Sequence, residues 1–464
     1  MTSQILFVHA RGGPPLDYAL PRIAARGQVH LLALQPPPPV IAQECLSHCT
    51  TLIPAWEQRR HGDDLTDLIV THARLAGADA IYTLSEFAIT AVAQAAERLG
   101  LPGAGPNVLR SRDKRLMRAV WESAGVPSPR FRPVPDQAAL RRALRDLTPP
   151  LLLKSAWGSG SVGQLVIGSA DGVAAAWADS HAAITEAAKA ALPLAEPGAT
   201  GDFLAEEIIP GSTRSWWANG AGYGDYLSVE GIVVAGAYHP VCITTRLPTI
   251  PPFTETANVA PCALPEDLQR IVESTARDAV GALGLSTCGT HTEIKLMAGR
   301  QLAVIESAAR FGGAMIAGQI EHVYGYDLVG MLADALLGAP VRLPDRMLTD
   351  RDARGAACSL SLIATDAAGV PWTQDLIWNA DLVDWSSMVT PGTRVDVVPA
   401  FTVPNGTPMP RYELSSGNAA LGGILFLRAA EAATVVRDAR AVLNGLEHAL
   451  AEGSRELVTL EVVT

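Results

Sequence analysis

The residues best suited to chemistry in this chain lie close together, in the stretch HTEIKLMAGRQLAVIESAARFGG at positions 291–313. Two glutamates, Glu293 and Glu306, interrupt apolar runs typical of β-strands, and Arg310 follows the second glutamate by four residues. Carboxylates are among the side chains least often buried without a partner. The pattern therefore indicates that another group offsets the charge of both glutamates.

A two-residue turn at 298–299 predicts how the two strands of this stretch pair. In that register Glu293 faces Val304. Glu306 faces His291, so the glutamates are diagonal neighbours on one face, roughly 7–8 Å apart at the backbone. Carboxylates aimed at one point repel each other unless a proton or a cation lies between them. A site with a small number of protein oxygen ligands, and with room for phosphate oxygens, suits Mg²⁺. We therefore expect a magnesium site here. A three-residue turn would instead place the glutamates on opposite faces.

Arg310 is close enough in sequence to act at the same site. A guanidinium there could stabilise the negative charge that develops on a transferred phosphoryl group. The simpler interpretation is an ion pair between Arg310 and Glu306, which are four residues apart, at the start of a helix. The spacing alone is consistent with both interpretations.

A second candidate is the glycine-rich stretch KSAWGSGSVG, at positions 154–163. A Walker phosphate loop carries its lysine at the end of the loop and is followed by a helix, whereas here Lys154 precedes the glycines and the β-like QLVIGS follows them. This order predicts a β-hairpin whose glycine tip lets backbone N–H groups approach phosphate oxygens, with Lys154 on the strand beneath. A plain mobile turn is the alternative.

Lysine is rare in this chain, and its few positions are therefore informative. Of 36 basic residues only four are lysine, and two of these, Lys114 and Lys154, lie near other candidates. A site that keeps lysine where arginine is used elsewhere is a candidate for needing a compact ammonium group. The alternative explanation is a codon bias towards arginine, under which four lysines remain by chance.

Weaker candidates lie in three further stretches. In FLAEEIIPG the adjacent Glu206 and Glu207 end an apolar strand, where the backbone can present N–H and C=O groups to an adenine edge; an ordinary strand ending fits equally well. Trp216, in SWWANGAGYGDY, lines an acceptor site or belongs to a loop that covers the core. Glu230 and His239 are substrate-side candidates, with a satisfied core or rim histidine as the alternative for His239.

The elements that must position these residues begin with an alternation of strand and helix. QILFVHA, VHLLAL and ADAIYTL have the composition of strands, and FAITAVAQAAERLG has helical spacing that ends at Gly100. This alternation predicts a parallel sheet with helices on both faces. The turn at 11–13 lacks the full glycine fingerprint of a dinucleotide site.

Further along the chain the pattern becomes α+β. A capped helix is expected over about 113–123, and an amphipathic helix begins near Pro265 and ends near Gly284. DLVGMLADALLG indicates another helix, and GGILFLRAAEAATVVRDARAVLNGLEHAL a strand followed by a long helix. The fold class predicted for the whole chain is therefore α/β (α+β).

Composition excludes several classes of function. A net charge of −11 without a basic run argues against nucleic-acid binding. No apolar run reaches the ~18 residues of a membrane span, and the N-terminus lacks a signal-peptide pattern, so we expect a soluble, cytoplasmic protein. Six cysteines do not make a disulfide scaffold, and because Cys45, His48 and Cys49 have no second ligand pair nearby, core thiols are favoured over a metal site.

In order along the chain, these features resemble the ATP-grasp superfamily over about residues 1–335. The order is Lys114 on a small helix, Lys154 before a glycine-rich hairpin, the EEII segment, then the two glutamates and Arg310. The run HTEIKL…IESAARFGG is more specific and resembles the L-amino-acid ligases. The resemblance implies an N-terminal α/β domain (1–110), a small lobe with the glycine hairpin (111–225), a large lobe with the metal site (226–340) and an extra C-terminal α+β domain (341–464).

The resemblance also implies a role for each matching residue. Arg310 would stabilise the transferring phosphoryl group, and the glutamates would bind one or two Mg²⁺ ions, with Mn²⁺ as the alternative. The residues implied to contact ATP are Lys114, Lys154, Gly158, Ser159, Gly160, Ser161, Gly163, Glu206, Glu207, Ile208 and Ile209. Two positions depart from the common pattern: Ala308 stands where many members carry a metal-binding asparagine, and residues 212–214, Ser-Thr-Arg, offer no acidic ribose contact.

The implied reaction joins an amino acid to a second amino acid or short peptide. ATP phosphorylates a carboxylate, and an amine then displaces phosphate from the acyl phosphate. The alternatives are an ATP-grasp enzyme with another acceptor, such as a carboxylase or an amide ligase of nucleotide synthesis, and a non-catalytic nucleotide-binding protein. The sequence predicts no nucleic-acid or membrane partner and is consistent with either a monomer or a homodimer.

Overall fold

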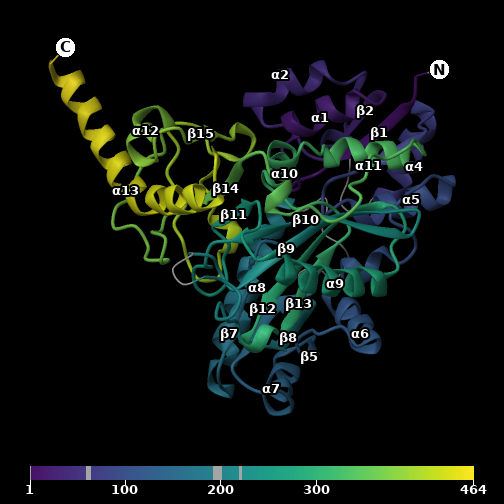
Figure 1. The fold of residues 1–464 in the computed structure, drawn as a ribbon, viewed down its shortest axis with the longest axis horizontal. Helices are drawn as coiled ribbons and strands as arrows, with labels where there is room; N and C mark the ends of the chain where they lie inside the picture. The colour runs from purple at the N-terminus through teal and green to yellow at the C-terminus, as the bar shows by residue number, and fades with distance from the viewer. Residues whose placement is uncertain (1, 59–63, 192–200, 219–221, 464) are drawn as a thin grey trace.

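A computed structural model of the chain describes residues 2–58, 64–191, 201–218 and 222–463 (Figure 1). Its N-terminal part is a parallel sheet, as predicted, and the strand order is β3-β2-β1-β4. The strands are β1 (Gln4–His9), β2 (Gln28–Ala33), β3 (Thr51–Pro54) and β4 (Ala80–Tyr82). The helices of this part are α1 (Leu16–Ala24), α2 (Pro39–Ser47), α3 (Ala55–Gln58), α4 (Leu65–Ala76) and α5 (Ile89–Leu99).

Alternating residues of β1 explain why helices cover both faces of this sheet. Phe7 packs in one apolar cluster with Leu20 of α1, whereas Leu6 packs in another with Ile69 of α4. The loops after β1 and β4 leave the sheet at the same edge, because parallel strands share their carboxyl ends. Residues 11–13 and Glu86 therefore project together from that edge towards the rest of the molecule.

The small lobe is an antiparallel sheet in the order β5-β8-β6-β7, at the lower end of the molecule in Figure 1. The glycine-rich stretch connects β6 to β7 as a hairpin, which confirms the predicted strand-loop-strand order. Helix α6 begins directly after Asp113, whose side chain accepts a hydrogen bond from the N–H of Arg115. The elements are β5 (Phe131–Val134), β6 (Leu151–Ser155), β7 (Leu165–Ile167), β8 (Phe203–Glu207), α6 (Lys114–Ala124), α7 (Gln137–Asp146) and α8 (Val173–Ala191).

The large lobe and the C-terminal residues share one eight-stranded sheet, in the order β13-β12-β9-β10-β11-β14-β16-β15. Three strands from the segment after residue 341 thus extend the sheet that carries the predicted metal site. The strands are β9 (Tyr226–Val234), β10 (Ala237–Arg246), β11 (Ala257–Ala260), β12 (Cys288–Leu296), β13 (Leu302–Ala308), β14 (Ala356–Leu362), β15 (Arg394–Val397) and β16 (Gly423–Ala429). The helices are α9 (Glu266–Leu283), α10 (Ile316–Tyr324), α11 (Leu328–Leu336), α12 (Trp385–Met388) and α13 (Ala432–Val463), the last of which projects at the C-terminus.

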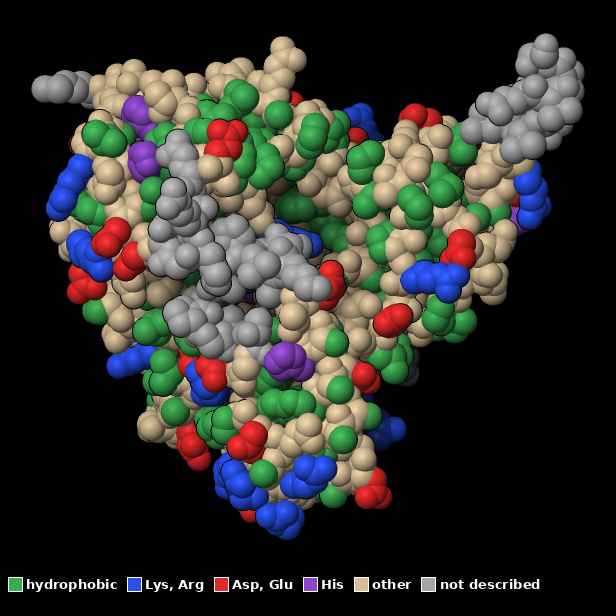
Figure 2. Space-filling model, turned by 180° about the vertical axis from the view of Figure 1, so that it is seen from behind, with side chains coloured by type: hydrophobic (Ala, Val, Ile, Leu, Met, Phe, Trp, Pro, Cys, Tyr) green, Lys and Arg blue, Asp and Glu red, His purple; other side chains and the backbone are tan. Residues whose placement is uncertain are grey.

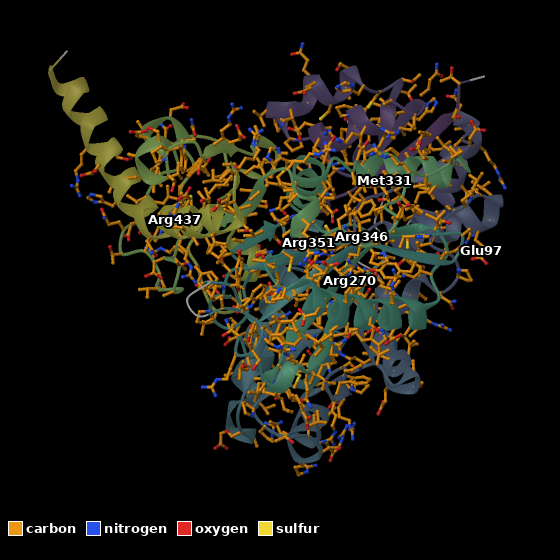
Figure 3. The ribbon with its side chains drawn as sticks, in the orientation of Figure 1. Glu97, Arg270, Met331, Arg346, Arg351 and Arg437 are labelled. Carbon is orange, nitrogen blue, oxygen red and sulfur yellow. The ribbon has the colours of Figure 1, made fainter. Side chains whose placement is uncertain are left out.

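An arginine cluster ties α9 to the chain that leads into β14 (Figure 3). Arg270 donates to the backbone oxygen of Met347 at 3.3 Å. Arg351 forms an ion pair with Glu266 of α9 at 2.9 Å. These contacts fix the C-terminal segment against the outer helix of the large lobe.

Two sequence expectations concern the rest of the molecule. In the described part of the chain, no helix is both long and apolar enough to span a lipid bilayer. Cys45 is buried in an apolar cluster against which Cys49 packs, and burial raises the pKa of the Cys45 thiol to about 12. Cys45 is therefore a core thiol, as the sequence favoured, and Cys49 is partly buried against the same cluster.

Candidate active site

A cavity of 1330 Å³ lies between the N-terminal part, the small lobe and the large sheet. Figure 2 shows the surface hollowed between these parts, with apolar and basic side chains visible in the hollow. Predicted site residues from separate parts of the sequence line the cavity together: Lys114, Lys154, Gly158, Ser159, Gly160, Ser161, Glu206, Glu207, Ile208, Ile209, Glu293, Glu306 and Arg310. The fold thus gathers nearly all of the predicted nucleotide, metal and catalytic candidates around one space.

The hairpin that carries the two glutamates pairs differently from the predicted register. Glu293 lies directly opposite Glu306, not Val304. The turn spans three residues, 298–300, with Gly299 in the left-handed conformation at φ 67°. A three-residue turn alone would put the glutamates on opposite faces, but a β-bulge adds one unpaired residue, Ile305, to β13. The bulge restores the common face, so the predicted register is wrong and the predicted face is correct.

The donor set formed by Glu293 and Glu306 fits a divalent cation that also binds phosphate. Both carboxylates line the cavity and keep about a quarter of their side-chain surface exposed, at 25% and 22%. Mg²⁺ is usually held by one or two carboxylates together with substrate phosphates and water. Among the described residues no group of three or more His, Cys, Asp or Glu is arranged to hold a metal.

Lys114 connects the glutamate pair to the glycine hairpin. Its Nζ donates to Glu306 Oε1 at 3.1 Å and to the backbone oxygen of Gly158 at 2.7 Å. The side chain is almost fully buried, at 4% exposure, at the first turn of α6. A positive charge at this position can neutralise either the carboxylate or a phosphate oxygen that approaches the same point.

Lys154 lies in a buried triad with Glu206 and Arg118. Lys154 and Arg118 both form ion pairs with Glu206, the second at 3.1 Å between Nη2 and Oε2. Burial lowers the pKa of Lys154, and the Glu206 carboxylate opposes that effect. Glu206 is therefore the counter-ion of the two cations, a role that the EEII pattern did not reveal. Its neighbour Glu207, on the alternate face of β8, pairs with the exposed Arg130 at 3.0 Å.

Arg310 precedes α10 in an irregular segment and reaches across to the N-terminal part. Its Nε lies 2.7 Å from Glu86 Oε2, and Arg112 approaches the other oxygen of Glu86 at 3.6 Å. The alternative pairing of Arg310 with Glu306 on a helix is not present. Sequence reasoning missed Glu86, although a polar residue just beyond the carboxyl end of a parallel strand is a recognised position for ligand contacts.

The glycine hairpin is held closed by a segment from the far end of the sequence. The N–H of Gly163 donates to the oxygen of Ser415 at 2.9 Å, and the N–H of Asn418 donates to the oxygen of Gly160 at 2.8 Å. A Cβ on Gly417 would lie 2.5 Å from the oxygen of Gly160, so the two segments pack backbone to backbone. Gly163 is engaged in this contact and is not among the described residues that line the cavity.

The substrate-side candidates need correction. Trp216 is 2% exposed within the core, and its indole N–H donates to the oxygen of Met297 at 2.7 Å, so it does not face the cavity. His239 lies on β10 beside the turn that joins β9 to β10, and it is not among the described lining residues. Glu230 is fully buried and accepts a hydrogen bond from His291 Nδ1 at 2.6 Å. It therefore positions His291, which does line the cavity.

The charge around His291 changes its protonation. Burial alone would lower the pKa of His291, but Glu230 and then Glu293 raise it to about 9. The ring therefore carries a positive charge at neutral pH. Its Nε2 lies 3.4 Å from Glu293 Oε1. The imidazolium thus orients Glu293 towards the cavity.

Comparison with known proteins connects this geometry to named relatives. No protein-family model matches the chain. Over 361 residues, which cover 74% of this chain and 75% of the relative, the sequence is 34% identical to the alanine–anticapsin ligase of Bacillus subtilis strain 168.

Solved structures share the fold at lower identity. The L-amino acid ligase from Bacillus licheniformis superimposes with a TM-score of 0.71 at 18% identity, over 95% of this chain and 97% of that chain. The biotin carboxylase domain of Hydrogenobacter thermophilus 2-oxoglutarate carboxylase, in complex with MgADP, gives a TM-score of 0.61 at 16% identity, over 93% of this chain and 87% of that chain.

Proposed function

The chain belongs to the ATP-grasp family of L-amino-acid ligases, which includes the alanine–anticapsin ligases, and on this premise we propose how its residues carry out the reaction. The enzyme forms a peptide bond with ATP and a divalent metal ion, and its substrates are amino acids or peptides. The observation that carries the residue assignment is the direct pairing of Glu293 with Glu306, on the cavity face, beside Lys114 and Arg310.

The nucleotide lies between the small lobe and β13 in this proposal. The backbone at 206–209 holds the adenine, and Lys154 places its ammonium on the phosphates from the strand beneath the glycine hairpin. Because Glu206 is bound to Lys154 and Arg118, it orients the lysine and does not contact the base itself. The N–H groups of the glycine hairpin, which has no obstructing Cβ at 158 and 160, cover the phosphates.

Glu293 and Glu306 would hold the metal in this proposal, as one or two Mg²⁺ ions, with Mn²⁺ as the alternative. A divalent ion at this position neutralises phosphate charge during phosphoryl transfer. Ala308 offers no ligand, so the two carboxylates are the protein groups that would hold the ion. The imidazolium of His291 keeps Glu293 ionised and aimed at the cavity.

Arg310 acts on the phosphoryl group in both chemical steps. In the first step a carboxylate oxygen attacks the γ-phosphorus, the bond to the bridging oxygen breaks, and ADP leaves. In the second step the amine attacks the acyl carbonyl, the amine loses its proton, and inorganic phosphate leaves as the amide forms. The guanidinium of Arg310, held by Glu86, stabilises the charge on the phosphoryl oxygens in both transition states. Closure of the glycine hairpin keeps water from the acyl phosphate.

The donor and acceptor are an amino acid and a second amino acid or short peptide, joined in the cytoplasm where ATP is available. A carboxylase or a nucleotide-pathway amide ligase on this fold would use bicarbonate or a nucleotide precursor instead. The relative that matches 74% of this chain is named an alanine–anticapsin ligase, which favours the peptide-forming reaction.

A labelled-oxygen experiment tests this function. The purified enzyme is screened with pairs of amino acids and short peptides for phosphate release, and the products are identified by mass spectrometry. With a donor whose carboxylate carries ¹⁸O, one label should appear in the inorganic phosphate, because the acyl phosphate transfers that oxygen. Release of AMP and pyrophosphate would point to adenylation and contradict the proposal.

A further inference from the structure

The cavity extends well beyond the region assigned to nucleotide and metal. Its 1330 Å³ exceeds the roughly 300–1,000 Å³ of an ordinary ligand pocket. At one end the lining residues come from β11, β14, β16 and the segments that pack against these strands, and they are uncharged and mostly apolar. We call this end the side-chain recess. The recess is lined by Asn258, Ala314, Ile316, Ser361, Phe401 and Ile424.

The sheet register places the recess residues side by side. Asn258 of β11 lies opposite Ser359 of β14. Ser361, two residues further along β14 and therefore on the same face, lies opposite Ile424 of β16. The apolar members belong to or pack against one cluster: Ala314, Ile316, Phe401 and Ile424. The recess is thus one continuous surface shared by the large lobe and the C-terminal strands.

Asn258 is the unusual member of this surface. The residue is 5% exposed, and its side-chain Oδ1 has no hydrogen-bond partner among the described residues. The guanidinium of Arg246, its partner across β10 and β11, is already bound to Ser228 and Thr244. A buried carbonyl without a partner costs about 1–3 kcal/mol. Because Asn258 lines the cavity, a bound molecule can supply the missing donor.

The distance along the sheet indicates which part of a substrate reaches the recess. From β12, which carries Glu293, three strand steps lead to β11 and four to β14. At about 4.8 Å a step, the recess lies roughly 14–19 Å from the metal-binding strand. The reacting carbonyl must lie next to the γ-phosphate, near Glu293. The recess therefore receives a part of the substrate that points away from the reacting atoms.

We propose that this recess binds an uncharged, mostly apolar side chain of one of the two joined residues, and that Asn258 accepts a hydrogen bond from a donor at its tip. The inference rests on the proposed ligase function and adds the chemical class of the side chain. Glu255, a lining carboxylate three residues before Asn258, already forms an ion pair with Arg246. The six recess residues themselves include no ionisable group, which disfavours lysine, arginine, aspartate or glutamate at this position. Suitable side chains are aliphatic or aromatic groups that end in a hydroxyl or an amide.

The test compares amino acids of similar shape that differ in the donor: tyrosine with phenylalanine, and glutamine with methionine. In the unsubstituted enzyme kcat/KM should favour the donor-bearing member. In Asn258→Leu this preference should fall by about 5- to 30-fold, which corresponds to the loss of one hydrogen bond of about 1–2 kcal/mol. The matched control, Asn107→Leu, makes the same change at a residue bound to the backbone oxygen of Gly284, outside the cavity lining, and should keep the preference. Fragmentation of the product then shows whether the selected residue is N-terminal or C-terminal.

A second variant and a binding measurement test the recess independently of catalysis. Ser361→Val fills the recess from the neighbouring strand and should shift selection towards smaller side chains. With a non-hydrolysable ATP analogue, the preferred amino acid should raise the melting temperature of the unsubstituted enzyme but not of Asn258→Leu. The recess proposal would be overturned if a folded Asn258→Leu variant kept the side-chain preference of the unsubstituted enzyme, and if the preferred amino acid raised both melting temperatures equally. If no ligated product formed, but the preferred amino acid still raised the melting temperature only of the unsubstituted enzyme, the ligase function would be overturned and the recess would remain supported.

Discussion

The buried triad of Arg118, Lys154 and Glu206 offers a sharp test of how the cavity is held ready for nucleotide. Their side chains are 0%, 3% and 5% exposed, so all three charges are removed from water. Glu206→Gln keeps the shape of the side chain and removes its charge. It leaves two buried cations facing each other without a counter-ion.

The expected cost follows from this geometry. Removing one partner of a buried ion pair typically costs about 3–5 kcal/mol, because the remaining charge is left unpaired. Lys154→Met should cost less, since Glu206 keeps Arg118 as its partner. In the double variant, Glu206→Gln with Lys154→Met, the loss in unfolding free energy should be about 1–3 kcal/mol smaller than the sum of the two single losses. The control, Glu207→Gln, breaks a pair with the 61% exposed Arg130 and should cost at most about 1 kcal/mol.

Urea unfolding followed by tryptophan fluorescence, without nucleotide, measures these free energies. The pH dependence gives an independent readout. Burial alone would raise the pKa of Glu206, but Lys154 and Arg118 hold it below its ordinary value of 4.5. Its contribution to stability is therefore complete above pH 4.5 and is lost as the pH falls through the lowered pKa. In Glu206→Gln the free energy of unfolding should therefore fall less as the pH is lowered through this range. Additive single losses, within about 0.5 kcal/mol, would refute the triad as a coupled unit.

Three further outcomes are expected. Glu306→Ala should abolish ADP formation while the melting temperature stays close to that of the unsubstituted enzyme, and normal ADP release would exclude Glu306 from the metal site. Lys154→Met should raise the KM for ATP about 10- to 100-fold, since a charge-assisted hydrogen bond contributes about 1.5–3 kcal/mol; an unchanged KM would remove Lys154 from the nucleotide site. Gly417→Ala places a Cβ 2.5 Å from the oxygen of Gly160 and should loosen the glycine hairpin, seen as faster proteolysis between 155 and 165 and a higher KM for ATP. Gly406→Ala, also at a positive φ (88°, against 50° for Gly417) but with open space around it, should change neither quantity.

Local patterns in the sequence were sufficient for much of the fold. The alternation of strand and helix predicted the parallel N-terminal sheet, and the lysine before the glycines predicted the hairpin between β6 and β7. Cap residues also gave reliable boundaries, since Asp113 begins α6 and Gly284, at φ 64°, ends α9. These signals depend on neighbouring residues, which is why one chain is enough to interpret them.

Contacts between distant segments could not be predicted in the same way. Glu86 reaches Arg310 from 224 positions away, and the segment around Ser415 closes over the glycine hairpin from beyond residue 400. No periodicity or spacing marks such pairs, because they depend on how separate sheets and loops dock. For Trp216 the sequence was consistent with both an acceptor-site contact and a loop that covers the core, and packing placed it in the core.

The sequence by itself determined that two glutamates would share a β-hairpin with an arginine shortly after it, and that a glycine-rich hairpin with a preceding lysine would accompany them. Only the tertiary structure decided that the glutamates face one another. Side chains alternate along a strand, so their common face depends on a single additional residue, the bulge at Ile305. The position of a bulge reflects how the strand fits its neighbours in the sheet, and a sequence pattern of period two cannot specify it.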